Sequence, residues 1–248
     1  MKIILKIFFS RFEELFPVGK RVELNIQNMI GKGGYGKVYE INEMYVIKSF
    51  NNNDGDEFKN SMKLSQIDEK YYNKNLIHPI AGGIDIFNNK YIILPYLKTI
   101  KIKNYNFEKT LKKIVEVQKY LIRNLNKYHM DLKPDNIMYN QKIEDFVIID
   151  LGYLGSCEIN NKVLLNYISK NYNLNYENTE KLAIYQILLF SIYILSDYEL
   201  EEVLKLNYLQ KKYIIEYSNC KESYKSILYK MLNNQVNFEL LFKIFSII

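Results

Sequence analysis

The sequence contains few cysteines and no long apolar run. Cys157 and Cys220 are the two cysteines among its 248 residues, which excludes both a disulfide framework and a cysteine-based zinc cluster. Thiols this sparse suit a reducing compartment, so we expect a cytoplasmic protein. The longest apolar stretch, residues 182–195, is interrupted by Gln186 and Ser191 and falls short of the roughly 18 to 20 residues that span a bilayer. We therefore expect a buried helix there and no membrane span.

Arginine is also scarce, although the chain is basic. The net charge is +6, and Arg11, Arg21 and Arg123 are the only arginines, so lysine supplies almost all of the positive charge. Because the lysines are scattered rather than grouped into a dense basic block, a solvated surface is favoured over nucleic-acid binding. The 15% aromatic content excludes intrinsic disorder, since it offers ample apolar surface to bury.

Hydrophobic periodicity divides the chain into a strand-rich part and a helical part. Residues 1–10 superficially resemble a secretory signal, but Lys6 interrupts the apolar run and no small-residue cleavage site follows, so we interpret them as folded structure. These patterns predict an α+β fold, in which a small antiparallel sheet with one helix precedes a mainly helical half. The expected elements are strands within 22–50, a loop at 51–56, a helix over about 57–74, a hairpin of 84–87 and 91–94, a helix over 107–128, and mostly helix over 179–248.

Four glycines fall within residues 31–36, between two predicted strands. Glycines at this spacing let a backbone turn approach phosphates closely and aim N–H groups at them. A dinucleotide-binding fingerprint needs a helix directly afterwards, whereas residues 38–41 continue as a strand. Lys48 ends the next apolar strand, and a buried ammonium must find an anion. Phosphate oxygens held under the glycine turn would supply that anion.

The most specific pattern is His-Met-Asp-Leu-Lys-Pro-Asp-Asn at residues 129–136, followed one strand later by Asp150-Leu-Gly. Asp131 can accept a proton from an attacking hydroxyl, and Lys133 can neutralise charge on a transferring phosphoryl group. Asn136 and Asp150 offer the oxygen ligands that Mg²⁺ prefers. An acid, a lysine, an amide and a second acid in this order indicate phosphoryl transfer.

Together these motifs resemble the eukaryotic-type protein kinases, in family order and near family spacing. They cover about residues 28–152, and a weaker match runs through the helix that starts near Glu180. The resemblance implies a bilobal fold with ATP and Mg²⁺, or Mn²⁺, as cofactors. It also implies one kinase domain, with an N-terminal extension at 1–21, an N-lobe at 22–97 and a reduced, mainly helical C-lobe at 98–248.

The resemblance further assigns roles to single residues. Leu94 is the expected gatekeeper beside the adenine, Pro95 opens the expected hinge, and Val46 replaces the usual alanine of the adenine pocket. The implied catalytic residues are Asp131 and Lys133, and the implied metal ligands are Asn136 and Asp150. The implied ATP-binding residues are Gly31, Lys32, Gly33, Gly34, Tyr35, Gly36, Val38, Val46, Lys48, Glu69, Leu94, Pro95 and Leu97.

A helix glutamate should pair with Lys48 in such a kinase. We predict Glu69, because it precedes His78 by about the interval usual in the family. Asp68 and Glu57 are the alternatives, and Glu57 lies close after the strand that ends in Lys48.

The chain departs from the family pattern at two places. Met130 stands where an arginine normally reads a phosphate on the activation loop, so we expect no control by loop phosphorylation. No Ala-Pro-Glu motif follows Asp150, and the segment before Glu180 is shorter than usual. These features resemble the minimal kinases of some viruses and bacterial effectors, which implies action in a host cytoplasm.

The leading hypothesis is a Ser/Thr protein kinase that transfers the γ-phosphoryl group of ATP to protein hydroxyls. The sequence Asp131-Leu-Lys133 resembles the Ser/Thr-specific form of the catalytic loop. One alternative is a pseudokinase, a scaffold that binds ATP and a partner protein. The other is a small-molecule kinase of related fold. A protein substrate is the expected partner, and the need for an activating protein stays open.

Overall fold

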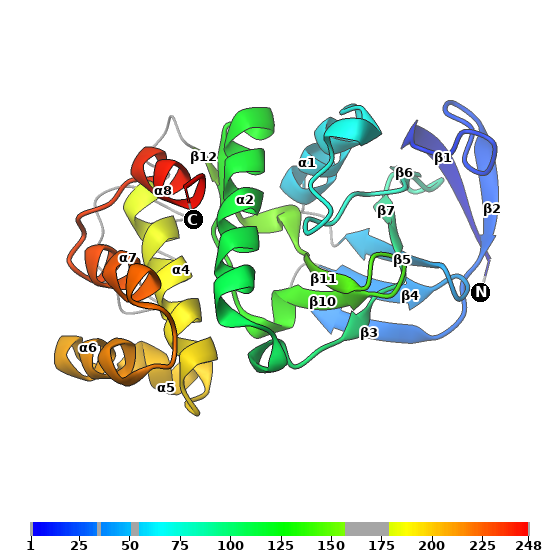
Figure 1. The fold of residues 1–248 in the computed structure, drawn as a ribbon. Helices are drawn as coiled ribbons and strands as arrows, with labels where there is room; N and C mark the ends of the chain where they lie inside the picture. The colour runs from blue at the N-terminus through cyan, green and yellow to red at the C-terminus, as the bar shows by residue number, and fades with distance from the viewer. Residues whose placement is uncertain (1, 34–35, 51–54, 157–178, 248) are drawn as a thin grey trace. The chain divides into compact units, whose positions relative to one another are not determined.

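The computed structural model describes residues 2–33, 36–50, 55–156 and 179–247 (Figure 1). This chain is a mixed α+β protein that divides into two compact units. The first unit comprises Met1–Thr99 and Met138–Gly152, and the second comprises Ile100–Ile137 and Tyr153–Ile248. The sequence analysis divides the chain at residues 97 and 98, and it does not anticipate the return of Met138–Gly152 to the first unit.

A seven-stranded sheet with the order β2-β1-β6-β7-β5-β4-β3 dominates the first unit. Every pairing between its neighbouring strands is antiparallel, as the sequence predicts. The strands are β1 (Lys2–Ser10), β2 (Arg21–Asn25), β3 (Met29–Gly33), β4 (Gly36–Glu40), β5 (Tyr45–Phe50), β6 (Ala81–Ile84) and β7 (Lys90–Pro95).

Strand β1 belongs to this sheet and is not an extension beside it. It pairs with both β2 and β6, and its buried and exposed residues alternate, which is the period of a half-buried strand. The pairing of β1 with β6 has a register shift between Ile7 and Phe9. Ile7 belongs to one core cluster and Phe9 to another. Phe9 packs on Phe58 of α1 (Gly55–Ser65), with ring centroids 5.7 Å apart. Figure 1 shows α1 beside β6 and β7.

The helix expected over 57–74 is shorter, because α1 ends at Ser65 and a separate 3₁₀ turn covers Glu69–Tyr71. The Ser65 hydroxyl donates to the Met62 carbonyl (2.8 Å), and the Asp68 carboxylate accepts from the Lys70 N–H (3.1 Å). Such local side-chain bonds compete with continuation of a helix. The expected hairpin is confirmed as β6 and β7, and its second strand matches the expected 91–94. The placement of its first strand is wrong, because β6 ends at Ile84, where the expected strand begins.

A smaller sheet of order β11-β10-β8 completes the first unit. Its strands are β8 (Lys98–Thr99), β10 (Ile137–Asn140) and β11 (Asp145–Ile148). The backbone of Ile148 accepts from the Ile77 N–H (2.9 Å) and donates to the Asn75 carbonyl (2.8 Å). These bonds attach β11 to the segment before β6 and thereby fix where the chain emerges at Asp150.

The second unit is mainly helical, as expected. Its helices are α2 (Phe107–Leu125), α4 (Thr179–Leu195), α5 (Leu200–Lys205), α6 (Tyr208–Tyr217), α7 (Glu222–Leu232) and α8 (Phe238–Phe245), and its strands are β9 (Lys127–His129) and β12 (Leu154–Ser156). Asn106 caps α2 by accepting from the Lys109 N–H (2.9 Å), and Asn126 ends it with φ of 54°. The buried helix predicted at 182–195 is confirmed as most of α4.

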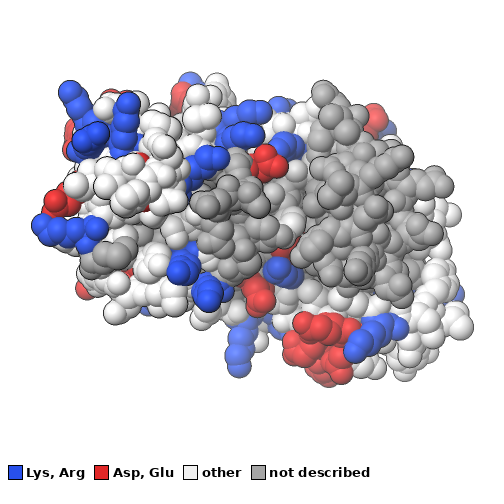
Figure 2. Space-filling model, turned by 180° about the vertical axis from the view of Figure 1, so that it is seen from behind, with Lys and Arg blue, Asp and Glu red and all other residues white. Residues whose placement is uncertain are grey.

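Within the described part of the chain, no helix is both long and apolar enough to cross a membrane. Figure 2 shows lysine and arginine side chains dispersed over the visible face among uncharged and acidic residues. This distribution is that of the solvated lysine-rich surface expected from the sequence.

Candidate active site

A mainly apolar pocket lies within the first unit and has one charged end. Its volume is about 140 Å³, below the range of about 300–1,000 Å³ for sites that enclose a whole drug-sized ligand. The pocket therefore encloses at most one ring system of a larger ligand. Of the predicted ATP-binding residues, it is lined by Val38, Val46, Lys48, Leu94, Pro95 and Leu97.

Lys48 occupies the charged end of this pocket between two carboxylates. Its Nζ lies 2.6 Å from Oε2 of Glu57 and 4.0 Å from Oδ1 of Asp150. The side chains of Lys48 and Glu57 are 14% and 4% exposed, so water screens their attraction weakly. A buried pair of this kind holds the ammonium in one position and leaves it facing Asp150.

The predicted partner of Lys48 is therefore corrected from Glu69 to Glu57. Glu69 lies beyond the end of α1, is 78% exposed and pairs with Arg11 at 3.2 Å. The alternative Asp68 caps the same 3₁₀ turn. Glu57, disfavoured for its closeness to the strand, reaches Lys48 because α1 already begins at Gly55.

The glycine segment forms the hairpin of β3 and β4. Gly31, Lys32 and Gly33 lie on β3 and Gly36 begins β4, with Gly33 opposite Gly36. A Cβ on Gly36 would lie 2.0 Å from the backbone oxygen of Ser49, so glycine is required there by the close approach of β5. The predicted residues Gly34 and Tyr35 lie outside the described residues, and phosphate binding by this hairpin stays a prediction.

Asp150 is held in an unusual backbone conformation. Its φ is 66°, a left-handed value that costs a non-glycine residue energy and is typical of functional positions. Its Oδ1 accepts from the Gly152 N–H at 3.1 Å, and Asn60 of α1 donates to the Leu151 carbonyl at 2.8 Å. Helix α1 thus supplies both Glu57 and an anchor for the segment that carries Asp150.

The predicted catalytic residues of the second unit cluster around one carboxylate oxygen. Oδ2 of Asp131 accepts from Lys133 Nζ at 2.6 Å and from Asn136 Nδ2 at 2.9 Å. Asn136 also donates to the Asp131 backbone carbonyl at 2.8 Å. Asp131 is buried, with 8% of its surface exposed. The hydrogen bonds from Lys133 and Asn136 fix the orientation of its carboxylate.

Two buried glutamines next to this loop were missed as functional residues. Gln118 of α2 and Gln186 of α4 are each 2% exposed, and both hydrogen-bond to the backbone of residues 129–132. Their signal in the sequence is a polar residue on an otherwise apolar helix face. The sequence analysis used Gln186 only as an interruption of an apolar run.

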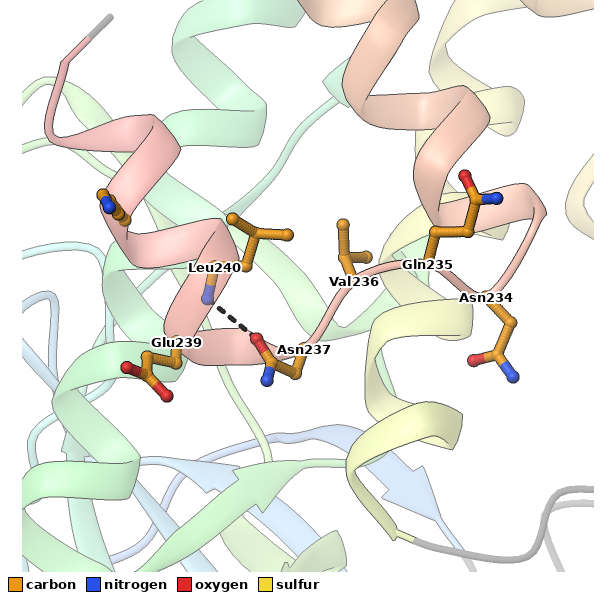
Figure 3. A pocket seen from close by; sticks show the side chains of 7 residues that line it. Asn234, Gln235, Val236, Asn237, Glu239 and Leu240 are labelled. Carbon is orange, nitrogen blue, oxygen red and sulfur yellow. Dashed lines mark hydrogen bonds between the residues drawn. The ribbon is translucent and has the colours of Figure 1, made fainter.

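A larger hollow, of about 580 Å³, lies at the turn between α7 and α8. Figure 3 shows that Asn237 there points its amide oxygen at the Leu240 N–H, 2.8 Å away, and so caps α8. The charged residues that line the hollow, Glu239 and Lys243, are exposed helix positions. We therefore do not assign a site there.

Asn136 belongs to the second unit and Asp150 to the first. Among the described residues, no group of three or more His, Cys, Asp or Glu side chains could hold a metal ion. The amide and carboxylate oxygens of Asn136 and Asp150 fit Mg²⁺ by their chemistry.

Residues 29–139 match the model of a family described as a family of unknown function (DUF5898). The matched segment contains the glycine hairpin, Lys48, Glu57 and the loop at 129–136. No curated protein matches the chain.

Proposed function

We propose that this chain is a compact, bilobal Ser/Thr protein kinase, in which the first unit binds ATP and the second supplies the base. The buried pair of Lys48 and Glu57, at 2.6 Å, is the observation that carries this proposal. Burying two charges costs free energy that a neutral pair would not. The cost is offset by function if the pair fixes the position of the Lys48 ammonium for an anionic ligand.

The pocket supports adenine binding in this proposal. Val38, Val46 and Leu97 offer apolar surface to a flat ring, and the limited volume leaves the sugar and phosphates outside. Lys48, at the charged end of the pocket, would hold phosphate oxygens. The hairpin of β3 and β4 would cover the phosphates with backbone N–H groups.

Asp131 would act as the base in phosphoryl transfer. Its carboxylate accepts the proton of a serine or threonine hydroxyl while the hydroxyl oxygen attacks the γ-phosphorus of ATP, and ADP leaves with the electrons of the broken P–O bond. Lys133, hydrogen-bonded to the same carboxylate, would neutralise charge on the transferred group. Asn136 and Asp150 would be the ligands of Mg²⁺, which would further neutralise charge on the phosphates.

The burial of Met130 supports activity without loop phosphorylation. Met130 is fully buried, and a Cβ on Gly155 would lie 2.8 Å from its Cγ. A thioether in that position cannot bind a phosphate. We expect treatment with phosphatase to leave the transfer rate nearly unchanged, and a large loss would mean that another basic group reads a phosphate.

The test is transfer of radiolabelled γ-phosphate, with Mg²⁺ or Mn²⁺, to the protein itself and to a generic basic protein. Asp131→Asn should abolish label on serine and threonine, because the amide cannot accept the proton. Asp135→Asn is the matched control, since Asp135 is an exposed carboxylate of the same loop, and it should keep the rate. Absence of label in the wild type, with ATP binding still visible by thermal shift, would reject the kinase and favour the scaffold.

A further inference from the structure

The backbone on both sides of Asp131 is held by amide side chains from two helices. Gln118 accepts from the His129 N–H at 2.9 Å and donates to the His129 carbonyl at 3.0 Å. Gln186 accepts from the Leu132 N–H at 3.2 Å and donates to the Met130 carbonyl at 2.6 Å. The four bonds enclose the position of the proposed base.

A primary amide suits this task because it donates and accepts at once, as a peptide group does. A carboxylate at the same place could accept but not donate, and an apolar side chain could do neither. Leaving buried backbone groups without partners is costly. Gln118 and Gln186 therefore complete the hydrogen bonding of a chain segment that leaves regular strand pairing after His129.

Both glutamines are neutral, and neither depends on a phosphate. Gln118 bonds to the backbone of His129, just before Met130, and Gln186 bonds to the Met130 carbonyl and the Leu132 N–H. At Met130 the resemblance to kinases implies an arginine that responds to phosphorylation. Because both amides are always present, they hold the loop in the same geometry whether or not another segment is phosphorylated.

We propose that Gln118 and Gln186 are positioning residues that hold Asp131 in its reactive geometry without phosphorylation. This inference rests on the proposed function, because it concerns the same base. In this proposal two amides hold the loop in its active geometry at all times. In the kinases that the chain resembles, the arginine at the position of Met130 pairs with a phosphate instead.

The decisive variant is Gln186→Glu, studied as a function of pH. Burial raises the pKa of a carboxyl group toward neutrality. The protonated carboxyl can donate to the Met130 carbonyl, whereas the ionised form cannot. We expect kcat relative to wild type to fall by about tenfold at pH 8, from loss of one buried hydrogen bond, and to recover severalfold at pH 6. The KM for ATP should stay unchanged, because every residue that lines the pocket belongs to the first unit.

Two further variants separate positioning from packing. Gln186→Leu should lose kcat by a factor that does not change with pH, since leucine has no proton to gain. Ser191→Ala removes another buried polar group of α4, a hydroxyl that donates to the Ile187 carbonyl of the same helix (2.7 Å), and it should keep kcat. Equal losses for Gln186→Glu and Gln186→Leu at every pH, or wild-type kcat in Gln186→Glu at pH 8, would overturn the proposal.

If the wild-type protein transfers no phosphate, the kinase proposal is rejected, but the hydrogen bonding of the loop by Gln118 and Gln186 is not. Native-state hydrogen exchange then gives a separate measurement. The Leu132 amide should exchange faster in Gln186→Leu than in the wild type, while Ser191→Ala leaves it unchanged. If the exchange rate of that amide is unchanged in Gln186→Leu, Gln186 does not hold the loop, and the proposal is overturned whether or not the protein transfers phosphate.

Discussion

Replacing Glu57 by glutamine tests the buried ion pair on which the proposed nucleotide site depends. The substitution keeps the size of the side chain and removes its charge, so Lys48 loses a partner at 2.6 Å. Removing one member of a buried pair costs about 3–5 kcal/mol, because the other charge stays buried. Lys48 keeps Asp150 at 4.0 Å, so we expect the lower end, about 3 kcal/mol.

This loss can be measured as a shift of thermal unfolding. A domain of this size shifts by about 2–4 °C per kcal/mol, so Glu57→Gln should lower Tm by about 6–12 °C. Glu69→Gln is the matched control, because its exposed pair with Arg11 contributes about 1 kcal/mol or less. The stability lost in the double variant Lys48→Met/Glu57→Gln should be smaller than the sum of the losses in the two single variants, since neither member of the pair is left buried without the other.

The same variants distinguish the two glutamates in nucleotide binding. Glu57→Gln should weaken ATP binding, because the ammonium of Lys48 is no longer held in position, whereas Glu69→Gln should bind as the wild type does. A larger loss of stability or affinity in Glu69→Gln than in Glu57→Gln would refute the assignment of the buried pair.

Three further predictions concern single residues. Asp150→Asn should abolish Mg²⁺-dependent transfer while the protein stays folded, and near-normal transfer would remove this metal assignment. Burial, and then the charge of Arg11, lowers the pKa of His78 from 6.5 to about 3. Below pH 6.5 the unfolded chain therefore binds a proton that the folded chain does not, so the free energy of unfolding should fall from pH 6.5 toward pH 3 by up to about 1.4 kcal/mol per pH unit. Urea unfolding of His78→Gln should lack this slope. Gly36→Ala should destabilise the sheet strongly, since its Cβ would meet a β5 carbonyl at 2.0 Å, whereas Gly31→Ala, with 3.6 Å to its nearest neighbour, should unfold nearly as the wild type does.

Much of the secondary structure could be predicted because it depends on local periodicity. Strand β1 alternates buried and exposed residues along its whole length, and α4 is apolar nearly all round, as the stretch at 182–195 indicates. The end of α1 could not be predicted in this way. It depends on how Ser65 and Asp68 bond to nearby backbone groups, which helical periodicity does not register.

The candidate site could be predicted where a chemical role requires a residue type at a fixed spacing. Asp131, Lys133 and Asn136 meet within hydrogen-bond distance, as their order along the chain indicates. Gln118 and Gln186 could not be found by the same reasoning, because an amide that bonds to backbone needs no motif. Their partners lie 11 and as many as 56 residues away in the sequence, and folding alone brings them together.

Glu57 and Glu69 have different cationic partners in the structure. The Arg11 N–H donates to the Ile80 carbonyl at 2.8 Å, which places the arginine beside the turn that carries Glu69. Its guanidinium lies 4.2 Å from the ring centroid of Tyr72 and pairs with Glu69 across 58 residues of sequence. Because β1 is part of the sheet, Arg11 engages the glutamate that sequence spacing favours. The carboxylate that meets the ammonium of Lys48 is the one near the start of α1. Spacing along the sequence could not separate the two glutamates, because the partner of Glu69 is an arginine 58 residues away.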